Sequence, residues 1–144
     1  MSVQRTKNIF AVSMEPGAIF AEAITTGYIE LNNYKYVDFL VCSGVGTAAD
    51  TTITFKGKGG EDGTAKAIPF AKKVGNSFTP VAATGDTLSI GGTVGECGKA
   101  TYRIDADALA KEGLDRVSLN STAVASSTVP GAVLVCLYEP RYSE

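Results

Sequence analysis

Two aspartates are the best candidates for acid–base chemistry in this chain of 144 residues. Asp105 and Asp107 fall in the run RIDADA, so their side chains would point the same way if a strand continued through them. Paired carboxylates can act as general acid and base, or they can bind a hard cation such as calcium. The alternative is a structural role, because Asp107 begins a segment of helical character, where a carboxylate caps backbone amides. We favour the capping role.

The sequence contains no histidine, which removes the usual general base and the commonest metal ligand. Nucleophile pairs of serine or cysteine with histidine are excluded for the same reason. Cys42, Cys97 and Cys136 are too few and too scattered for a cysteine-only zinc site. Their odd number and wide spacing do not predict a disulfide framework, so we expect free thiols and a reducing compartment. We therefore expect a protein that is not an enzyme and that binds no metal or cofactor.

Two other motifs could bind ligands but have simpler interpretations. The run GGTVGECGKA lacks the spacing of a phosphate-binding loop, since five residues separate Gly92 from Gly98 and an alanine replaces the hydroxyl residue. We expect a hairpin loop there. Tyr28, Tyr34 and Tyr36 could stack on sugars or bases, although alternating tyrosines are more often core or interface residues.

The net charge of −2 at pH 7 predicts no partnership with nucleic acid or with an anionic membrane. The densest basic stretch, residues 56–73, is interrupted by Glu61 and Asp62, and we expect it to be a solvated face. No run approaches the roughly 18 apolar residues of a membrane helix. The first 17 residues lack the apolar stretch of a signal peptide, so we expect a soluble protein made in a cytoplasm.

Short strand patterns separated by turn sequences recur along the chain, which predicts a single all-β domain. The expected strands cover residues 18–25, 34–42, 51–57, 66–72, 86–90, 100–105, 115–121 and 131–138. Residues 106–113 are expected to form one short helical turn that ends at Gly113. Residues 1–17 carry the weakest pattern. We therefore divide the chain into an extended N-terminal arm, residues 1–17, and a β-sandwich of jelly-roll-like type, residues 18–144.

Alternation within the expected strands predicts which side chains enter the core. This set contains Val37, Phe39, Val41, Ile53, Phe55, Ile68, Phe70, Leu88, Ile90, Tyr102, Ile104, Val117 and Leu119. Pro69 cannot donate a hydrogen bond to a ladder, so its strand should lie at an edge or contain a bulge.

The last expected strand, GAVLVCLY, is apolar on both faces. We expect Val133, Val135 and Leu137 to enter the core. The side chains of the opposite face belong to Ala132, Leu134, Cys136 and Tyr138. They would meet either a covering segment of the same chain or a neighbouring subunit, and the pattern does not distinguish the two.

Five segments, taken in order, carry a family resemblance. They are AITTGYIELNNYKYVDFLVCSG, TITFKGKGGEDGTAKAIPFAKK, GDTLSI, YRIDADALAKEGLDRVSLNST and VPGAVLVCLYEPRY. Together they resemble the small β-sandwich head decoration, or cement, proteins of tailed bacteriophages, from about residue 18 to the end. The resemblance implies a virion structural protein, made in the host bacterial cytoplasm, that binds the capsid exterior as a homotrimer. It would stabilise the shell by bridging neighbouring subunits of the major capsid protein. The alternative is a carbohydrate-binding β-sandwich module associated with a tail or fibre.

Four residues are our candidates for partner contacts: Arg141, Tyr142, Tyr138 and Phe10. Arg141 and Tyr142 follow the last strand, and arginine and tyrosine are favoured at interfaces. Tyr138 ends the apolar run, and Phe10 belongs to the expected arm.

Overall fold

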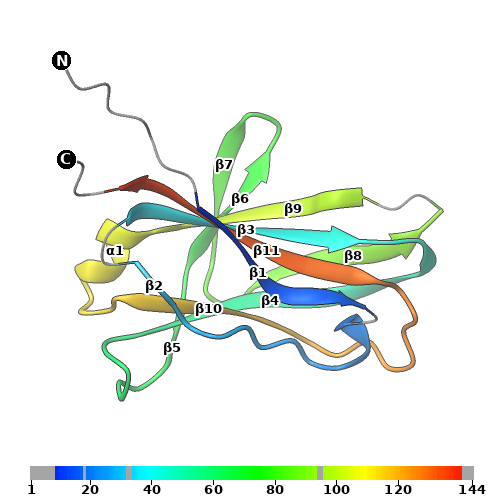
Figure 1. Ribbon diagram of the computed structural model, residues 1–144, viewed down its shortest axis with the longest axis horizontal. Helices are drawn as coiled ribbons and strands as arrows, with labels where there is room; N and C mark the ends of the chain where they lie inside the picture. Colours follow the sequence, from blue (N-terminus) through cyan, green and yellow to red (C-terminus); the bar gives the residue numbers. More distant parts are fainter. Residues whose placement is uncertain (1–8, 18, 32–33, 94–95, 141–144) are drawn as a thin grey trace.

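Two antiparallel sheets make up the protein in the computed structural model, which describes residues 9–17, 19–31, 34–93 and 96–140 (Figure 1). Within this part, the side chains of residues 9–16, 96–99 and 138–140 are not described. The sheets stack face to face and enclose one apolar core. The all-β sandwich predicted from the strand patterns is therefore confirmed.

Sheet A contains six strands in the order β1 (Ile9–Gly17), β11 (Gly131–Pro140), β3 (Tyr34–Ser43), β9 (Glu96–Asp105), β6 (Phe70–Val74) and β7 (Ser77–Val81). Sheet B contains β2 (Ile29–Glu30), β10 (Arg116–Ser121), β4 (Gly46–Lys58) and β5 (Lys66–Ile68), with β8 (Asp86–Gly92) paired to the first half of β4. A 3-10 turn, η1 (Ile19–Ala21), and a short helix, α1 (Ala106–Ala110), complete the described elements.

The core is built from the alternating side chains that the sequence predicts. Every member of the predicted core set is buried. Four rings tie the sheets together: Phe55 of sheet B lies 5.1 Å from Phe39, 4.7 Å from Phe70 and 5.8 Å from Tyr102, centroid to centroid. Such tilted and edge-to-face pairs add to the stabilisation that comes from burial.

The final strand, β11, lies inside sheet A between β1 and β3. Val133 and Val135 are buried in the core, and Leu137 packs against it. On the opposite face Cys136 is also buried, whereas Ala132 and Leu134 are half-buried. The unusual apolarity of this strand is thus explained in part by its central position.

The beginning of the chain differs from the predictions. Residues 9–17, within the expected arm, form edge strand β1, which pairs with β11 from Ile9 opposite Leu137 onwards. The strand predicted for residues 18–25 is wrong: it is replaced by η1 and irregular chain with a single bridge at Thr25. Phe20 and Ile24 are buried, but Glu22, which would share their face on a strand, is exposed, so the segment lacks a continuous inward face.

Two connections cross between the sheets. Pro69 separates β5 in sheet B from β6 in sheet A, so the strand predicted for residues 66–72 is two short strands. β5 is the edge of sheet B, as a strand beside a proline should be. The glycine-rich segment after Gly91 joins β8 in sheet B to β9 in sheet A, so the predicted hairpin loop is wrong. Glycines suit this connection because Gly91 and Gly92 adopt φ angles of 80° and 112°.

The cysteines also differ from expectation. Cys42 is disulfide-bonded, whereas Cys136 is a buried free thiol. The expectation of free thiols throughout is therefore wrong for Cys42. Strand pairing brings together residues that are far apart in the sequence, so spacing alone does not exclude a bridge.

Candidate binding pocket at the crossing between the sheets

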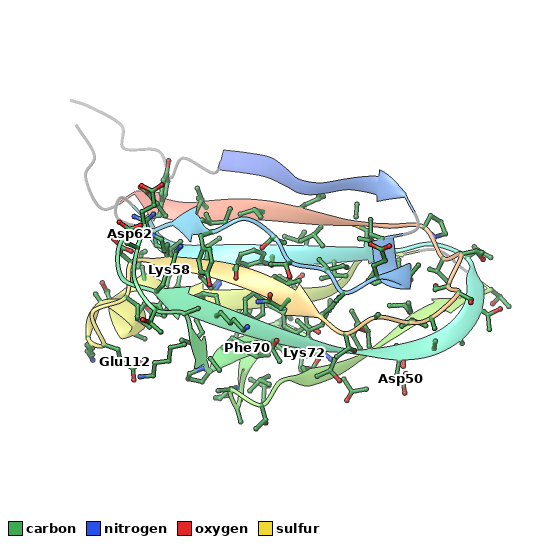
Figure 2. The ribbon with its side chains drawn as sticks, turned by 90° about the horizontal axis from the view of Figure 1, so that it is seen from below. Asp50, Lys58, Asp62, Phe70, Lys72 and Glu112 are labelled. Atoms are coloured by element: carbon green, nitrogen blue, oxygen red, sulfur yellow. The ribbon has the colours of Figure 1, made fainter. Side chains whose placement is uncertain are left out.

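A pocket of about 410 Å³ opens where the chain crosses from sheet B to sheet A. The chain enters sheet A just after Pro69, and β6 then pairs with β9 only at Ala71 and Lys72. The space left beside β9 is bounded on its other side by α1 and the turn that follows. The lining is mainly apolar and includes Ile68, Pro69, Phe70, Pro80, Ile104 and Leu109. Figure 2 shows Phe70 near the middle of the molecule and Glu112, which also lines the pocket, at the end that carries α1.

One wall of the pocket is a fixed arginine. Arg103 of β9 donates from Nε and Nη2 to the two carboxylate oxygens of Asp38, at 2.7 and 3.0 Å. Its guanidinium lies 4.9 Å from the ring centroid of Tyr36 and 4.1 Å from that of Phe78. Asp38 is buried, so the pair is shielded from water. The bidentate bond and the two rings hold the guanidinium plane in one orientation.

Two carboxylates lie at the opposite rim. Asp105 is the N-cap of α1, and its side chain accepts the backbone N–H of Asp107 at 2.8 Å. Glu112 accepts from Lys66 Nζ at 3.1 Å. Both acids are exposed. The prediction that Asp107 caps the helical segment is wrong: Asp105 is the N-cap, and Asp107 donates its backbone N–H to it.

The expected pairing of Asp105 with Asp107 does not form a shared site, since only Asp105 lines the pocket. A strand would have placed both on one face, but α1 begins at Ala106 and turns the second aspartate away. No cluster of three or more His, Cys, Asp or Glu side chains that could hold a metal ion occurs among the described residues.

The tyrosines proposed as a stacking platform are divided between the sheets. Tyr36 belongs to β3 and faces Arg103, with Lys35 Nζ also 5.3 Å from its ring. Tyr28 precedes β2 in sheet B, and Lys58 Nζ lies 4.3 Å from its ring. These two rings do not form one platform, and each already contacts a cation.

A hydrogen-bonded cluster of Tyr102, Lys72 and Asp86, which the sequence did not predict, links the two sheets. The hydroxyl of Tyr102 donates to Asp86 Oδ2 at 2.8 Å, and Lys72 Nζ donates to the same oxygen at 2.9 Å. Burial, reinforced by the hydrogen bond and charge of Asp86, raises the pKa of the Tyr102 hydroxyl far above its ordinary value near 10. Tyr102 could have indicated this cluster in the sequence, because a tyrosine on a core face needs a polar partner for its hydroxyl.

The lysines predicted to form one solvated face are also distributed over both sheets. Lys56 is exposed on sheet B, Lys66 reaches Glu112, and Lys72 points toward the interior at Asp86. Because their positions are divided between the two sheets, they do not form a track for phosphates.

The candidate contact residues are placed only in part. Arg141 and Tyr142 lie outside the described residues. The backbone of Tyr138 pairs with Tyr36, and that of Phe10 pairs with Cys136, while the side chains of Tyr138 and Phe10 are not described. The pairing places Tyr138 on the strand next to a residue of the pocket.

None of the helices in the described part of the chain is both long and apolar enough to span a bilayer. A scan against protein families finds no match, and neither does a search of curated protein sequences.

Two solved proteins have similar folds. The SPBc2 prophage-derived protein YomS matches with a TM-score of 0.60 and 12% identity, over 96% of this chain and 99% of YomS. The PBSX exported protein XepA matches with a TM-score of 0.59 and 16% identity, over 96% of this chain but 40% of XepA. At these identities the similarity establishes the fold alone: the chain has the same β-sandwich as these two proteins.

Proposed function

We propose that this chain is a structural protein of a bacteriophage particle. The observation that carries the proposal is the match of its fold, end to end, with the prophage-derived protein YomS. The order of sequence segments, which resembles that of head decoration proteins, supports the same role. The PBSX exported protein XepA has the same fold.

Within the particle, we place the protein on the capsid exterior as a decoration protein. It would bind the major capsid protein and bridge neighbouring subunits. Among the described residues, no buried side-chain nitrogen or oxygen lacks a hydrogen-bond partner. We therefore expect the domain to bind as a preformed unit, which limits the conformational freedom lost on docking. Several contacts of modest strength would then act together on a repetitive shell.

We propose a non-enzymatic role, on the evidence of the pocket itself. Arg103 is engaged by Asp38, Glu112 by Lys66, and Asp105 by the start of α1. A general acid or base needs to reach a substrate proton. Arg103 and Asp105 hold the fold and are poorly suited to that task, whereas Glu112 is in a solvated pair with Lys66.

The proposal is tested on purified particles. Quantitative mass spectrometry should find the protein in a fixed ratio to the major capsid protein, because equivalent binding positions repeat over the shell. Particles made without it should lose their genome at a lower temperature. A particle with no copies, or with only a few, contradicts the decoration role.

The contact residues are tested by the double substitution Arg141→Ala and Tyr142→Ala. We expect occupancy on particles to fall because the two side chains most suited to an interface are removed. A matched control is Asp62→Asn, an exposed change in the loop after β4. Unchanged occupancy of the double variant would show that the contact lies elsewhere.

The second candidate is a carbohydrate-binding module of a tail or fibre. The pocket favours it, since a tyrosine ring, an arginine and two carboxylates surround an apolar floor, and sugars bind to such mixtures of stacking and polar groups. A glycan array, together with labelling of the protein on particles, separates the two roles. A glycan hit on a tail-located protein selects the module, whereas head labelling without a hit selects decoration.

A further inference from the structure

We propose that the pocket beside α1 binds an organic cation, meaning an ammonium or guanidinium group carried on an apolar body about the size of one aromatic ring. This ligand class goes beyond the proposed function, because it follows from the pocket alone and holds for a protein of the head or of the tail. A free amine and a basic side chain of another protein both present this chemistry, and different probes separate the two sources.

The pocket contains apolar surface that is open to solvent. Phe70 and Leu109 line it and are buried, so this part of the wall is packed before a ligand arrives. Pro69, Pro80 and Ala108 also line it and are exposed. A ligand that covers these three residues removes apolar surface from water, which is favourable. The volume of about 410 Å³ lies in the lower part of the range for small-molecule pockets and limits the size of the apolar body.

The arginine in the lining does not make the pocket a receptor for anions. Arg103 donates to both carboxylate oxygens of Asp38, and Asp38 is buried. The guanidinium also lies against the rings of Tyr36 and Phe78. An anion that drew Arg103 away from Asp38 would leave a buried carboxylate without its partner, which is costly. Arg103 is therefore a fixed wall with an offset charge.

Asp105 supplies a carboxylate oxygen that no described residue uses. Its Oδ1 accepts the backbone N–H of Asp107, whereas its Oδ2 accepts no hydrogen bond from the described part of the chain. Asp105 is exposed, lines the pocket and forms no ion pair with a described residue. A hydrogen bond between a carboxylate and a charged donor is roughly twice as strong as one between neutral groups. The free oxygen beside apolar surface thus favours a ligand with a positive charge.

Glu112 places a second carboxylate on the same side of the pocket. The residues that α1 and the following turn contribute to the lining are Asp105, Ala108, Leu109 and Glu112, with the i, i+3, i+4, i+7 spacing of one helical face. Glu112 pairs with Lys66, but both side chains are half exposed or more. Because such a solvated pair contributes little, Glu112 can accept a ligand cation in exchange.

The charges around the pocket do not balance. The charged lining residues and their ion-pair partners are two cations and three carboxylates, namely Arg103, Lys66, Asp38, Asp105 and Glu112. The excess of one negative charge is complementary to a ligand with one positive charge. A neutral sugar or an anion would leave this charge uncompensated.

An NMR titration of the purified full chain at pH 7 tests the ligand class. The probes are 2-phenylethylamine, the neutral 2-phenylethanol of the same shape, the anion 3-phenylpropionate, and methyl glucoside. We expect the amine to bind with a dissociation constant on the order of 1 mM, because a ligand of this size makes few contacts. It should shift the backbone amides of residues 103–105 and 108–112. The alcohol should bind about three-fold more weakly, and the anion and the sugar more weakly still.

Four variants locate the site. Asp105→Asn keeps a residue that is favoured at the N-cap but removes the charge, so the amine should lose its advantage over the alcohol. Asp107→Asn removes a charge from the same helix outside the lining and should leave that advantage intact. Ala108→Trp fills the pocket and should abolish binding, whereas Ala110→Trp, exposed on the same helix but outside the lining, should not. The dispersion of the amide signals shows whether each variant is folded.

Two further titrations identify the source of the cation. An acetylated and amidated phenylalanyl-lysine peptide carries the chemistry of a protein segment. If it shifts the same amides, the pocket accepts a basic side chain of a partner, and if it is excluded while the amine binds, the pocket accepts a free amine. The amine titration is then repeated on a chain truncated after Pro140. Binding to the truncated chain alone would mean that the terminus of this chain occupies the pocket, and it would overturn the proposal of an external ligand.

Other results would also overturn the proposal. They are an amine that shifts no pocket amide in either chain, an alcohol or a sugar that binds as tightly as the amine, and an anion that binds more tightly. An amine preference that survives Asp105→Asn would contradict the assigned carboxylate. All these measurements use the isolated chain, so their outcome is independent of the test of the capsid role on particles.

Discussion

Two arginines, one on the outer face of each sheet, are held in different ways. Arg103 of sheet A is bound through both carboxylate oxygens of Asp38, whose side chain is only 4% exposed. Arg116 of sheet B contacts Asp115 at 3.0 Å and Glu30 at 3.3 Å, and these side chains are 34% and 61% exposed. The same residue type therefore has a shielded partner in one sheet and solvated partners in the other.

The difference indicates which of the two arginine side chains is held more firmly. An exposed ion pair gains little because water screens it and the side chains must be ordered. A pair with a buried acid is costly to break, because the remaining charge loses its compensation. The stacking of Arg103 on Tyr36 and Phe78 adds a fixed geometry that Arg116 lacks among the described residues. The pocket lies on the rigid side, which suits recognition of a defined shape.

The largest effect is expected from Asp38→Ala, which leaves the Arg103 guanidinium without its carboxylate. We expect the free energy of unfolding to fall by about 2–4 kcal/mol, near the range for breaking a buried pair. Urea denaturation followed by circular dichroism measures it. Asp38→Asn keeps an acceptor and should lose less.

The matched control is Glu30→Ala in sheet B, where the exposed partner of Arg116 is removed. We expect a loss of less than about 1 kcal/mol. Equal losses for Asp38→Ala and Glu30→Ala would mean that burial of the acid does not distinguish the two arginines.

The sequence predicts this fold well where a strand has one apolar face. Val37, Phe39 and Val41 share one face of their strand, Ile53 and Phe55 share one face of theirs, and all five are buried. Period-two alternation reports directly on which side chains face a core, so these strands and their inward faces could be read from the chain.

The pocket could not be predicted, because it depends on which strands become neighbours. Pro69 indicates an interruption but not that the chain changes sheets there. Asp38 and Arg103 lie far apart in the sequence, and they meet only because β3 pairs with β9 in one register. Strand order and register depend on long-range contacts, which local patterns do not encode.

The exposure of Asp86 lies between that of Asp38 and that of Asp115. Its side chain is 20% exposed and accepts hydrogen bonds from Tyr102 and Lys72. Tyr102→Phe removes one of these bonds without opening a cavity. We expect a loss of about 1–2 kcal/mol, because a partly buried acceptor loses a donor. Thermal unfolding at neutral pH measures it, and no measurable loss would contradict the structural role of this hydroxyl.

The pH dependence of Tyr102 provides a second readout. Its pKa is raised in the folded protein, so the folded state holds this proton more tightly than the unfolded state does. The corresponding stability is complete below the unfolded pKa near 10 and is lost as the pH rises above it. The difference between the unaltered protein and Tyr102→Phe should therefore shrink above pH 10. A difference that grows in alkali would reverse this assignment.

The smallest effect is expected from Asp115→Asn, which removes the charge beside Arg116 while keeping an oxygen for the backbone N–H of Gly60. The Arg116 guanidinium, followed by that backbone N–H, holds the pKa of the Asp115 carboxyl below its usual value of 3.8. The stability it contributes is present above this value and is lost as the pH falls through the lowered pKa. At pH 7 we expect Asp115→Asn to cost no more than about 0.5 kcal/mol, since the pair is solvated. Urea denaturation at pH 7 should show this cost shrinking in high salt, and it should vanish in acid. A cost as large as that of Asp38→Ala, or one insensitive to salt, would show that the sheet B arginine is as shielded as the sheet A arginine.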